Sequence, residues 1–312
     1  MARFLWGTGR PSGASAHQRE RVICVTTEEL LSSAVRHHAG PAAFGDLPVR
    51  RVQLLVVLLA VVAGCGLFLD VYRDETAFAR NAYRGADLVS VLLAVPLLLL
   101  ALRSARRGSV RGLLLLLGGL AYIAYQYAYT FAYGWSRLFP IYLTLLALSA
   151  FTLAEMLIRI DPHAVADRFY FRARVVGVAR FLFVIGLGLG LMEGLQVLVA
   201  VVTGNPPPIV AQTGHPTSPV YILDLGLIVP MMLLASRWLG RRRPWGFVAA
   251  SVLLVKGVTV GLGLLAANAL AVLAKTTTDG PLNFVWLLIA AGSGWALVLL
   301  LRQVRPATST DL

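Results

Sequence analysis

The chain has 312 residues, of which 58% are hydrophobic and 14% charged, and its mean hydropathy is +0.74. Ordinary soluble domains carry about 25% charged residues, so this composition excludes a soluble protein and predicts an all-α, polytopic membrane protein. In a soluble chain the net charge of +13 would suggest that the protein binds nucleic acid. In a membrane protein the informative property is which loops carry the basic residues, and no nucleic-acid partner is expected.

Residues 1–48 are polar and have no early apolar core long enough for a signal peptide. We expect a weakly ordered cytoplasmic tail, followed by a first span that is not cleaved. Cys24 lies in this tail and Cys65 in an apolar run, which argues against a disulfide framework.

Residues 49–306 form the predicted transmembrane domain, and residues 307–312 a short tail. A helix needs roughly 20 mostly apolar residues to cross a bilayer. The second run is short, so its helix must extend outward past Asp87 to reach bilayer thickness. The eight apolar runs cover approximately Val52–Leu69, Leu88–Leu102, Gly112–Tyr133, Leu138–Ile158, Val175–Val202, Val220–Ser236, Gly246–Ala274 and Leu282–Leu301.

The basic residues alternate between the connections of these spans. Of 28 lysines and arginines, 22 fall in one alternate set of connections and tails, five in the other set, and one, Lys256, inside a span. The positive-inside rule therefore predicts a multi-pass protein of the cell membrane with both termini in the cytoplasm. Only Lys256 and Lys275 are lysines, which is typical of a GC-rich genome, and we expect a bacterial source.

Spans two and six resemble each other. Each contains an Asp-Leu pair (Asp87 and Asp224), then a proline, and an arginine seven residues after that proline, although the distance from aspartate to proline differs by three residues. The match predicts a parallel repeat of four plus four helices about an axis along the membrane normal. The alternative is that the two spans acquired these residues independently. The helix dipole favours an aspartate near the start of any helix, and the positive-inside rule favours arginine at its cytoplasmic end.

Ionisable residues at membrane depth are candidates for a functional site because lipid cannot solvate them. Glu193 lies about 13 Å below the outer end of span five, at 1.5 Å per residue, and Gln196 follows one turn outward. Lys256 lies near the middle of span seven, with Glu193 as its expected partner and Asp224 as the second choice. A structural ion pair between helices is the alternative to a role in proton or ion coupling.

A small-residue stripe in span five, at Gly186, Gly190 and Gly194, predicts close approach of another helix. Asp224 and Asp87 are expected just below the outer surface, where stabilisation by a helix dipole is the alternative reading, more so for Asp87. Glu155 and Arg159 are one turn apart and are expected to form a surface ion pair.

Span three places polar aromatic residues on one face at helical spacing. They are Tyr122, Tyr125, Gln126, Tyr129 and Tyr133. An aromatic belt would explain the outer two, whereas a cavity wall would explain them all. Buried tyrosines with a backbone acceptor remain the alternative.

Motifs for common chemistry are missing from the sequence. It contains no Walker A, H-E-x-x-H, G-x-S-x-G or C-x-x-C motif, and no metal or cofactor is expected. The five histidines lie outside the spans, and only His215 is on the outer side, as an acid or base or as an ordinary loop residue.

The predicted site is a polar cavity that opens outward between helices two, three, five, six and seven. Its candidate ligand-binding residues are Glu193, Asp224, Lys256, Asp87, Gln126, Tyr129, Tyr122 and Gln196. The favoured function is binding and movement of a small solute or ion, which is not enzymatic. The alternatives are a membrane enzyme acting on a lipid-linked substrate and a non-catalytic assembly subunit. Polar groups continuing inward toward Glu155 would favour transport, and a pocket closed toward the cytoplasm would favour an enzyme.

Overall fold

The structure is a computed structural model that describes residues 46–131, 136–170, 175–276 and 280–305. Residues 1–45 of the predicted tail, Tyr133 and residues 306–312 lie outside the described residues. The described ranges contain no strand, only one isolated bridge between Phe169 and Val304. The all-α fold class is confirmed.

Eight segments of the described chain are long and apolar enough to cross a membrane, as predicted. The short helices α7 (Pro162–Asp167) and α9 (Pro208–Thr213) and the turn η4 (Gly280–Leu282) lie in the connections. In chain order the spans are α2 (Asp46–Phe68), α3–η2–α4 (Ala77–Val89, Ser90–Ala94, Val95–Ala105), α5 (Val110–Phe131), α6 (Phe139–Arg159), α8 (Val176–Thr203), α10–η3–α11 (Pro219–Leu223, Asp224–Ile228, Val229–Gly240), α12 (Pro244–Leu273) and α13 (Asn283–Arg302).

Proline and glycine set several helix ends. Pro219 and Pro244 occupy first-turn positions, where the missing N–H has no intrahelical acceptor to lose. Gly204 ends α8 in the left-handed conformation, at φ 71°, which glycine adopts without strain. Span two begins at Ala77, so it extends outward past Asp87 as expected, and Asp87 lies well beyond the first turn. The first-turn interpretation of Asp87 is therefore wrong.

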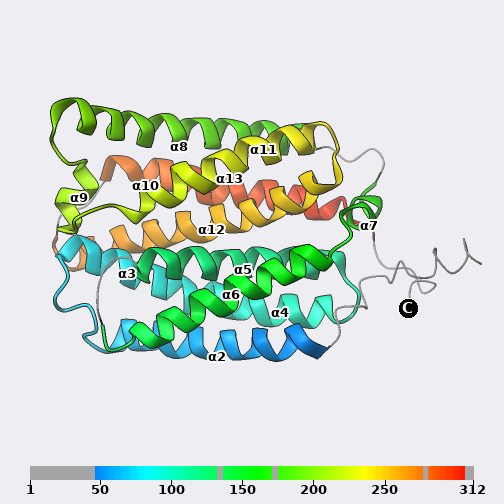
Figure 1. Ribbon diagram of the computed structural model, residues 1–312, viewed down its shortest axis with the longest axis horizontal. Helices are drawn as coiled ribbons and strands as arrows, with labels where there is room; N and C mark the ends of the chain where they lie inside the picture. The colour runs from blue at the N-terminus through cyan, green and yellow to red at the C-terminus, as the bar shows by residue number, and fades with distance from the viewer. Residues whose placement is uncertain (1–45, 132–135, 171–174, 277–279, 306–312) are drawn as a thin grey trace, which may run out of the picture. The chain divides into compact units, whose positions relative to one another are not determined.

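The spans form two groups of four that share one pattern of neighbours (Figure 1). In the first group α2 contacts α3 and α4, α4 contacts α5, α5 contacts α6, and α6 contacts α2 again. In the second, α8 contacts α11, α11 contacts α12, α12 contacts α13, and α13 contacts α8. Between the groups, α12 packs against α3 and α5, and α10 packs against α5. The predicted repeat requires this pattern, and superposition of the halves remains its test.

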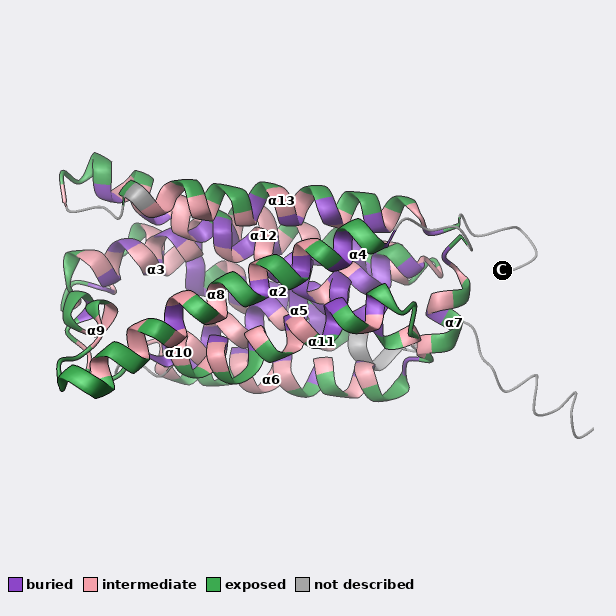
Figure 2. Cartoon of the chain, turned by 90° about the horizontal axis from the view of Figure 1, so that it is seen from above, coloured by how far each residue is buried: buried purple, intermediate pink, exposed green. Residues whose placement is uncertain are grey.

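Burial differs strongly between central and peripheral spans (Figure 2). Of the apolar windows of α5 and α12, 61% of residues are buried, against 17% in α8 and 22% in α13. Large apolar side chains on α8, such as Val184, Leu191 and Leu195, are exposed in the isolated chain. In a membrane the acyl chains of lipid cover such a surface.

The glycine stripe of α8 accounts for its packing on α11. A Cβ at Gly186 would lie 2.8 Å from the Cβ of Met232, and one at Gly190 would lie 2.9 Å from Val229. Nothing lies within 4 Å of the corresponding point at Gly194. The first two glycines of the predicted stripe therefore permit the close approach, and the third does not take part in it.

Spans two and six each contain a single π-helical turn shortly before a proline. The turns are Ser90–Ala94 and Asp224–Ile228, and Pro96 and Pro230 each lie two residues beyond the turn. A π-turn accommodates one extra residue and frees a carbonyl, so it fits beside a proline that cannot donate. The regular α-helical geometry is therefore interrupted at the corresponding place in both spans.

A single constant offset in residue number aligns span two and its following span with span six and its following span, without a gap. The π-turns begin at Ser90 and Asp224, and the following spans α5 and α12 begin at Val110 and Pro244, each pair 134 positions apart. At this offset Asp224 corresponds to Ser90, and Asp87 lies three residues outside. This offset explains why the distance from aspartate to proline differs by three residues between the two spans.

Candidate functional site: a cavity between the helices

A cavity of about 340 Å³ lies between both groups of helices. Spans two, three, five, six and seven line it as predicted, but span eight and the short helix α9 line it too. It extends from Gln212 on α9 past Lys256, near the middle of α12, to Leu253 and Met232. Pro208 and Gln212, both on α9, are its exposed lining residues. The mouth therefore lies at the α9 end of the bundle, opposite the arginine-rich connections.

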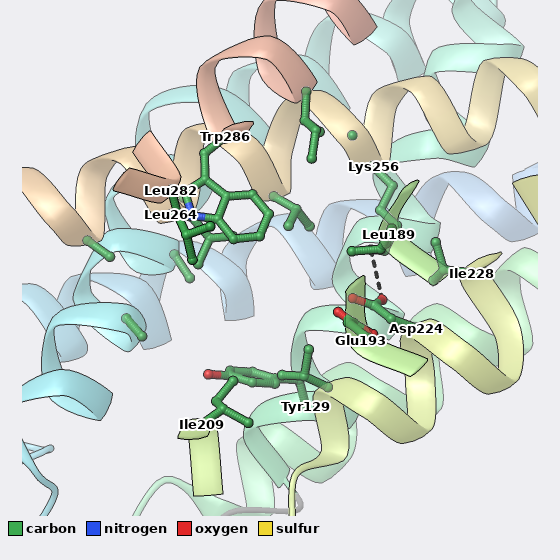
Figure 3. Close-up of a pocket in the computed structure, with 18 of the residues that line it drawn as sticks. Tyr129, Leu189, Glu193, Ile209, Asp224, Ile228, Lys256, Leu264, Leu282 and Trp286 are labelled. Atoms are coloured by element: carbon green, nitrogen blue, oxygen red, sulfur yellow. Dashed lines mark hydrogen bonds and ion pairs between the residues drawn. The ribbon is translucent and has the colours of Figure 1, made fainter. Parts of the chain in front are cut away.

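An ion pair lies at the deep end of this cavity (Figure 3). The Lys256 Nζ is 3.4 Å from Asp224 Oδ1, and both side chains are only 8% exposed. The Tyr125 hydroxyl donates a hydrogen bond to the same carboxylate oxygen at 2.9 Å. The Lys256 ammonium also lies 3.8 Å from the centroid of the Tyr125 ring. Tyr125 thus contacts both charges, through its hydroxyl and through its ring face.

The lysine partner differs from the one expected. Asp224, the second choice, forms the ion pair with Lys256, whereas Glu193 does not. Hydropathy places each residue at a depth but does not fix how α8 is rotated relative to α12. Asp224 starts the π-turn of span six, and contact between α11 and α12 brings it beside Lys256.

Glu193 lies next to this pair with an unsatisfied oxygen. Its side chain lines the cavity, the residue is 5% exposed, and its carboxylate lies beside that of Asp224 in Figure 3. Oε2 has no hydrogen-bond partner among the described residues. One turn outward, Gln196 Oε1 accepts a hydrogen bond from Tyr221 at 2.6 Å. A buried carboxylate with an unmet oxygen is costly, so it needs a proton or a cationic partner.

The polar face of α5 borders the cavity. Tyr122, Tyr125, Gln126 and Tyr129 all line it. Tyr122 is hydrogen-bonded to Ser90, with the two hydroxyl oxygens 2.8 Å apart, and it also donates to the Ala86 carbonyl at 3.3 Å. For Tyr122 the bonded-tyrosine alternative therefore describes the contacts, although the residue still borders the cavity.

Asp87 is not among the described residues that line the cavity. Its carboxylate accepts a hydrogen bond from the Tyr72 hydroxyl at 2.8 Å, and Tyr72 stacks on Tyr83 with 5.0 Å between ring centroids. Gly66 faces this carboxylate so closely that a Cβ there would overlap it. Burial, together with the Asp87 carboxylate, raises the pKa of Tyr72 well above its ordinary value. Asp87 thus belongs to a separate polar contact with the connection between spans one and two, beside Gly66 of span one.

Two other candidates have partners away from the cavity. His215 Nε2 lies 2.9 Å from Glu75 Oε2, and its side chain is 12% exposed, so it joins two connections and is not an exposed loop residue. Glu155 pairs with Arg159 at 2.6 Å, as predicted, and also with Arg51 of span one.

Several lining residues were not expected from the sequence. Trp286 and Leu282 face the cavity from the start of span eight, across from Glu193 in Figure 3. Asn268 lines it as well, and its amide nitrogen donates to Asn283 Oδ1 at 2.6 Å. The sequence signal that could have identified them is a polar residue, Asn268, and a large aromatic residue, Trp286, within otherwise aliphatic segments. Within the described ranges no group of three or more His, Cys, Asp or Glu side chains is placed to hold a metal ion.

Comparisons with known proteins assign the chain to no family. No protein-family model matches it, no curated protein sequence matches it, and no solved structure matches it. What the protein does must therefore follow from the chemistry of the cavity.

Proposed function

We propose that this multi-pass membrane protein binds a small water-soluble molecule in the cavity and moves it across the membrane. The observation that carries the proposal is the carboxylate of Glu193, unpartnered at Oε2 and buried beside the Asp224–Lys256 pair on the cavity wall. Ionisable groups at membrane depth are expensive and mark pathways for solutes and ions.

Packing alone does not require the ion pair. At the matching positions of the other half, 134 residues earlier, Ser90 and Tyr122 form a neutral hydrogen bond of 2.8 Å. That pair joins a π-turn to the next span just as Asp224 and Lys256 do. Because a neutral pair suffices for the junction, the charges of the second pair are available for another purpose.

The mouth of the cavity is proposed to face the outside of the cell. The arginine-rich connections lie at the other end of the bundle, and such connections stay in the cytoplasm. A mouth at exposed Pro208 and Gln212 of α9 opens toward water. This favours a soluble molecule over a lipid-linked one, which would enter from the side of the bundle.

Toward the arginine-rich end the described lining of the cavity stops at Ile185, Met232 and Leu253. Leu98, Leu117 and Leu120 are fully buried there, and the buried Ser251 hydroxyl bonds the Phe247 carbonyl of its own helix. A transporter open to one side is sealed on the other, and the paired π-turns give spans two and six places to bend. The same closure favours the second candidate, an enzyme with Glu193 and Asp224 as acid and base in a pocket open on one side.

Reconstituted protein distinguishes these functions. Proteoliposomes are challenged with amino acids, amines, carboxylic acids and sugars, while uptake and displaced charge are recorded. We expect uptake of one chemical class, lost in the Asp224→Ser, Lys256→Tyr double variant and retained in Glu155→Gln, which removes a carboxylate outside the cavity. A molecule that stabilises the protein but is not taken up would contradict transport, and chemical conversion of it would support the enzyme.

A further inference from the structure

We propose that the cavity binds a monovalent organic cation, a protonated amine with an apolar or aromatic body, and that its ammonium group pairs with Glu193. This inference rests on the proposed binding function and specifies its ligand class. Two independent observations carry it, namely the charge balance at the deep end and the apolar wall facing it.

The charge balance leaves one negative group unmatched. Asp224 and Lys256 are 3.4 Å apart and neutralise each other. Glu193 Oε2 has no hydrogen-bond partner among the described residues, and the residue is 5% exposed. A carboxylate so far from water needs either a proton or a counter-charge. An ammonium ion supplies that charge together with donors for the open oxygen.

An anionic ligand, in contrast, would be repelled by the charges at the deep end of the cavity. Lys256 is the cation that lines the cavity, and its contacts are already directed at Asp224 and at the ring of Tyr125. A carboxylate or phosphate entering here would face Glu193 and Asp224 side by side. Like charges at this distance repel strongly in a medium of low dielectric constant.

The rest of the wall suits an apolar body. Leu264, Leu282 and Trp286 lie across the cavity from Glu193, and Tyr129 and Ile209 lie toward the mouth (Figure 3). Aromatic faces also attract cations, as the position of Lys256 over Tyr125 already shows. A volume of about 340 Å³ is near the lower end of ligand pockets, which run from roughly 300 to 1,000 Å³. The ligand is therefore small.

Three probes of one shape separate charge from size. They are 2-phenylethylamine, 2-phenylethanol and phenylacetate, which carry a positive, a neutral and a negative end on the same ring. Their binding to the purified full chain in nanodiscs is measured at pH 7 by calorimetry. We expect the amine to bind at least about tenfold more tightly than the alcohol, a difference of about 1.4 kcal/mol, and the carboxylate to bind most weakly.

Variants of Glu193 assign the preference to this carboxylate. In Glu193→Gln the amine and the alcohol should bind within about twofold of each other, because the amine loses its ionic partner. Glu193→Asp keeps the charge on a shorter side chain and should keep the preference for the amine at lower affinity. Glu155→Gln, outside the cavity, should keep the preference of the natural chain. If Glu193→Gln does not fold, the natural chain and Glu193→Asp still give the comparison.

Each result decides the matter. Equal binding of amine and alcohol, or tighter binding of phenylacetate, overturns the inference but leaves a small-molecule cavity and hence the proposed function. A preference for the amine that persists unchanged in Glu193→Gln also overturns it, because the cation then sits elsewhere. Failure of all three probes to bind the natural chain also overturns the inference, whereas the proposed function fails only when no solute of the uptake panel is taken up.

Discussion

An offset of 134 residues, which relates the starts of the two π-turns, also relates Ser90 and Tyr122 to Asp224 and Lys256. Both pairs join the start of a π-turn to the next span, at 2.8 Å and 3.4 Å respectively. The neutral pair needs no counter-charge, whereas either member of the charged pair becomes an uncompensated charge when its partner is removed. The neutral pair therefore provides a natural replacement for the charged one.

The replacement can be tested by a double-mutant cycle. Lys256→Tyr and Asp224→Ser should each lower the free energy of unfolding, by up to about 3 to 5 kcal/mol for a buried charge left without its partner. The double variant recreates the pair of the other half and should recover most of the loss, giving a coupling energy above about 1 kcal/mol. Denaturant unfolding of the purified variants measures these differences. A double variant as unstable as the sum of the single ones would show that the two positions are not equivalent.

At the scale of the helices, each of the two π-turns sets which residue of its span meets the following span. Each turn holds one residue more than α-helical geometry needs, so the segment before it is rotated relative to the segment after it. In span six this rotation places Asp224 toward Lys256, and in span two it places Ser90 toward Tyr122.

Deleting one residue from each turn should therefore have distinct effects. Removal of Leu227 from η3 would restore α-helical geometry and turn the outer part of span six by about 100°, moving Asp224 away from Lys256. Removal of Leu93 from η2 would turn α3, which packs along α12 with Gly85 against the α12 backbone. We expect the second deletion to lower the melting temperature more, since α10 is short and partly exposed. Melting temperatures like that of the natural chain in both deletions would contradict this role of the turns.

The sequence predicted the spans well but not their rotations. Apolar length defines a span, and eight were found where the structure has them. The partner of Lys256 depends on helix rotation, which hydropathy does not report, so Glu193 was ranked before Asp224. The matching of Asp87 with Asp224 followed chemical identity, whereas the backbone pairs Asp224 with Ser90. Span eight was missed as a cavity wall because Trp286 is one aromatic residue in an apolar run.

At the scale of the whole bundle, the neighbour pattern is the one that a two-fold axis along the membrane normal between α5 and α12 would produce, and superposition of the halves would test that axis. Such an axis would relate span two to span six and span three to span seven. The contact of α3 with α12 would then correspond to the contact of α10 with α5, and both contacts are present. They are not equal, since α3 is 13 residues long and α10 is five. The cavity is lined by both of these helices, by α3 at Phe78 and Asn81 and by α10 at Val220 and Tyr221.

The orientation of this bundle determines which compartment supplies the ligand. Thr76 and Gln212 lie at the α9 end, where the Thr76 hydroxyl donates to the Gln212 carbonyl at 3.0 Å. Ser109 and Gly240 lie in or beside the arginine-rich connections at the opposite end. Thr277, which the sequence offers as a further probe position, lies outside the described residues.

Cysteine labelling in intact cells tests the orientation. In a chain whose Cys24 and Cys65 are replaced by serine, cysteine at Thr76 or Gln212 should react with a membrane-impermeant maleimide, because arginine-rich connections remain in the cytoplasm. Cysteine at Ser109 or Gly240 should react only after the membrane is permeabilised, which also controls for reactivity. The reverse pattern would place the mouth of the cavity in the cytoplasm, so that Glu193 would meet cytoplasmic amines and movement would begin from inside the cell.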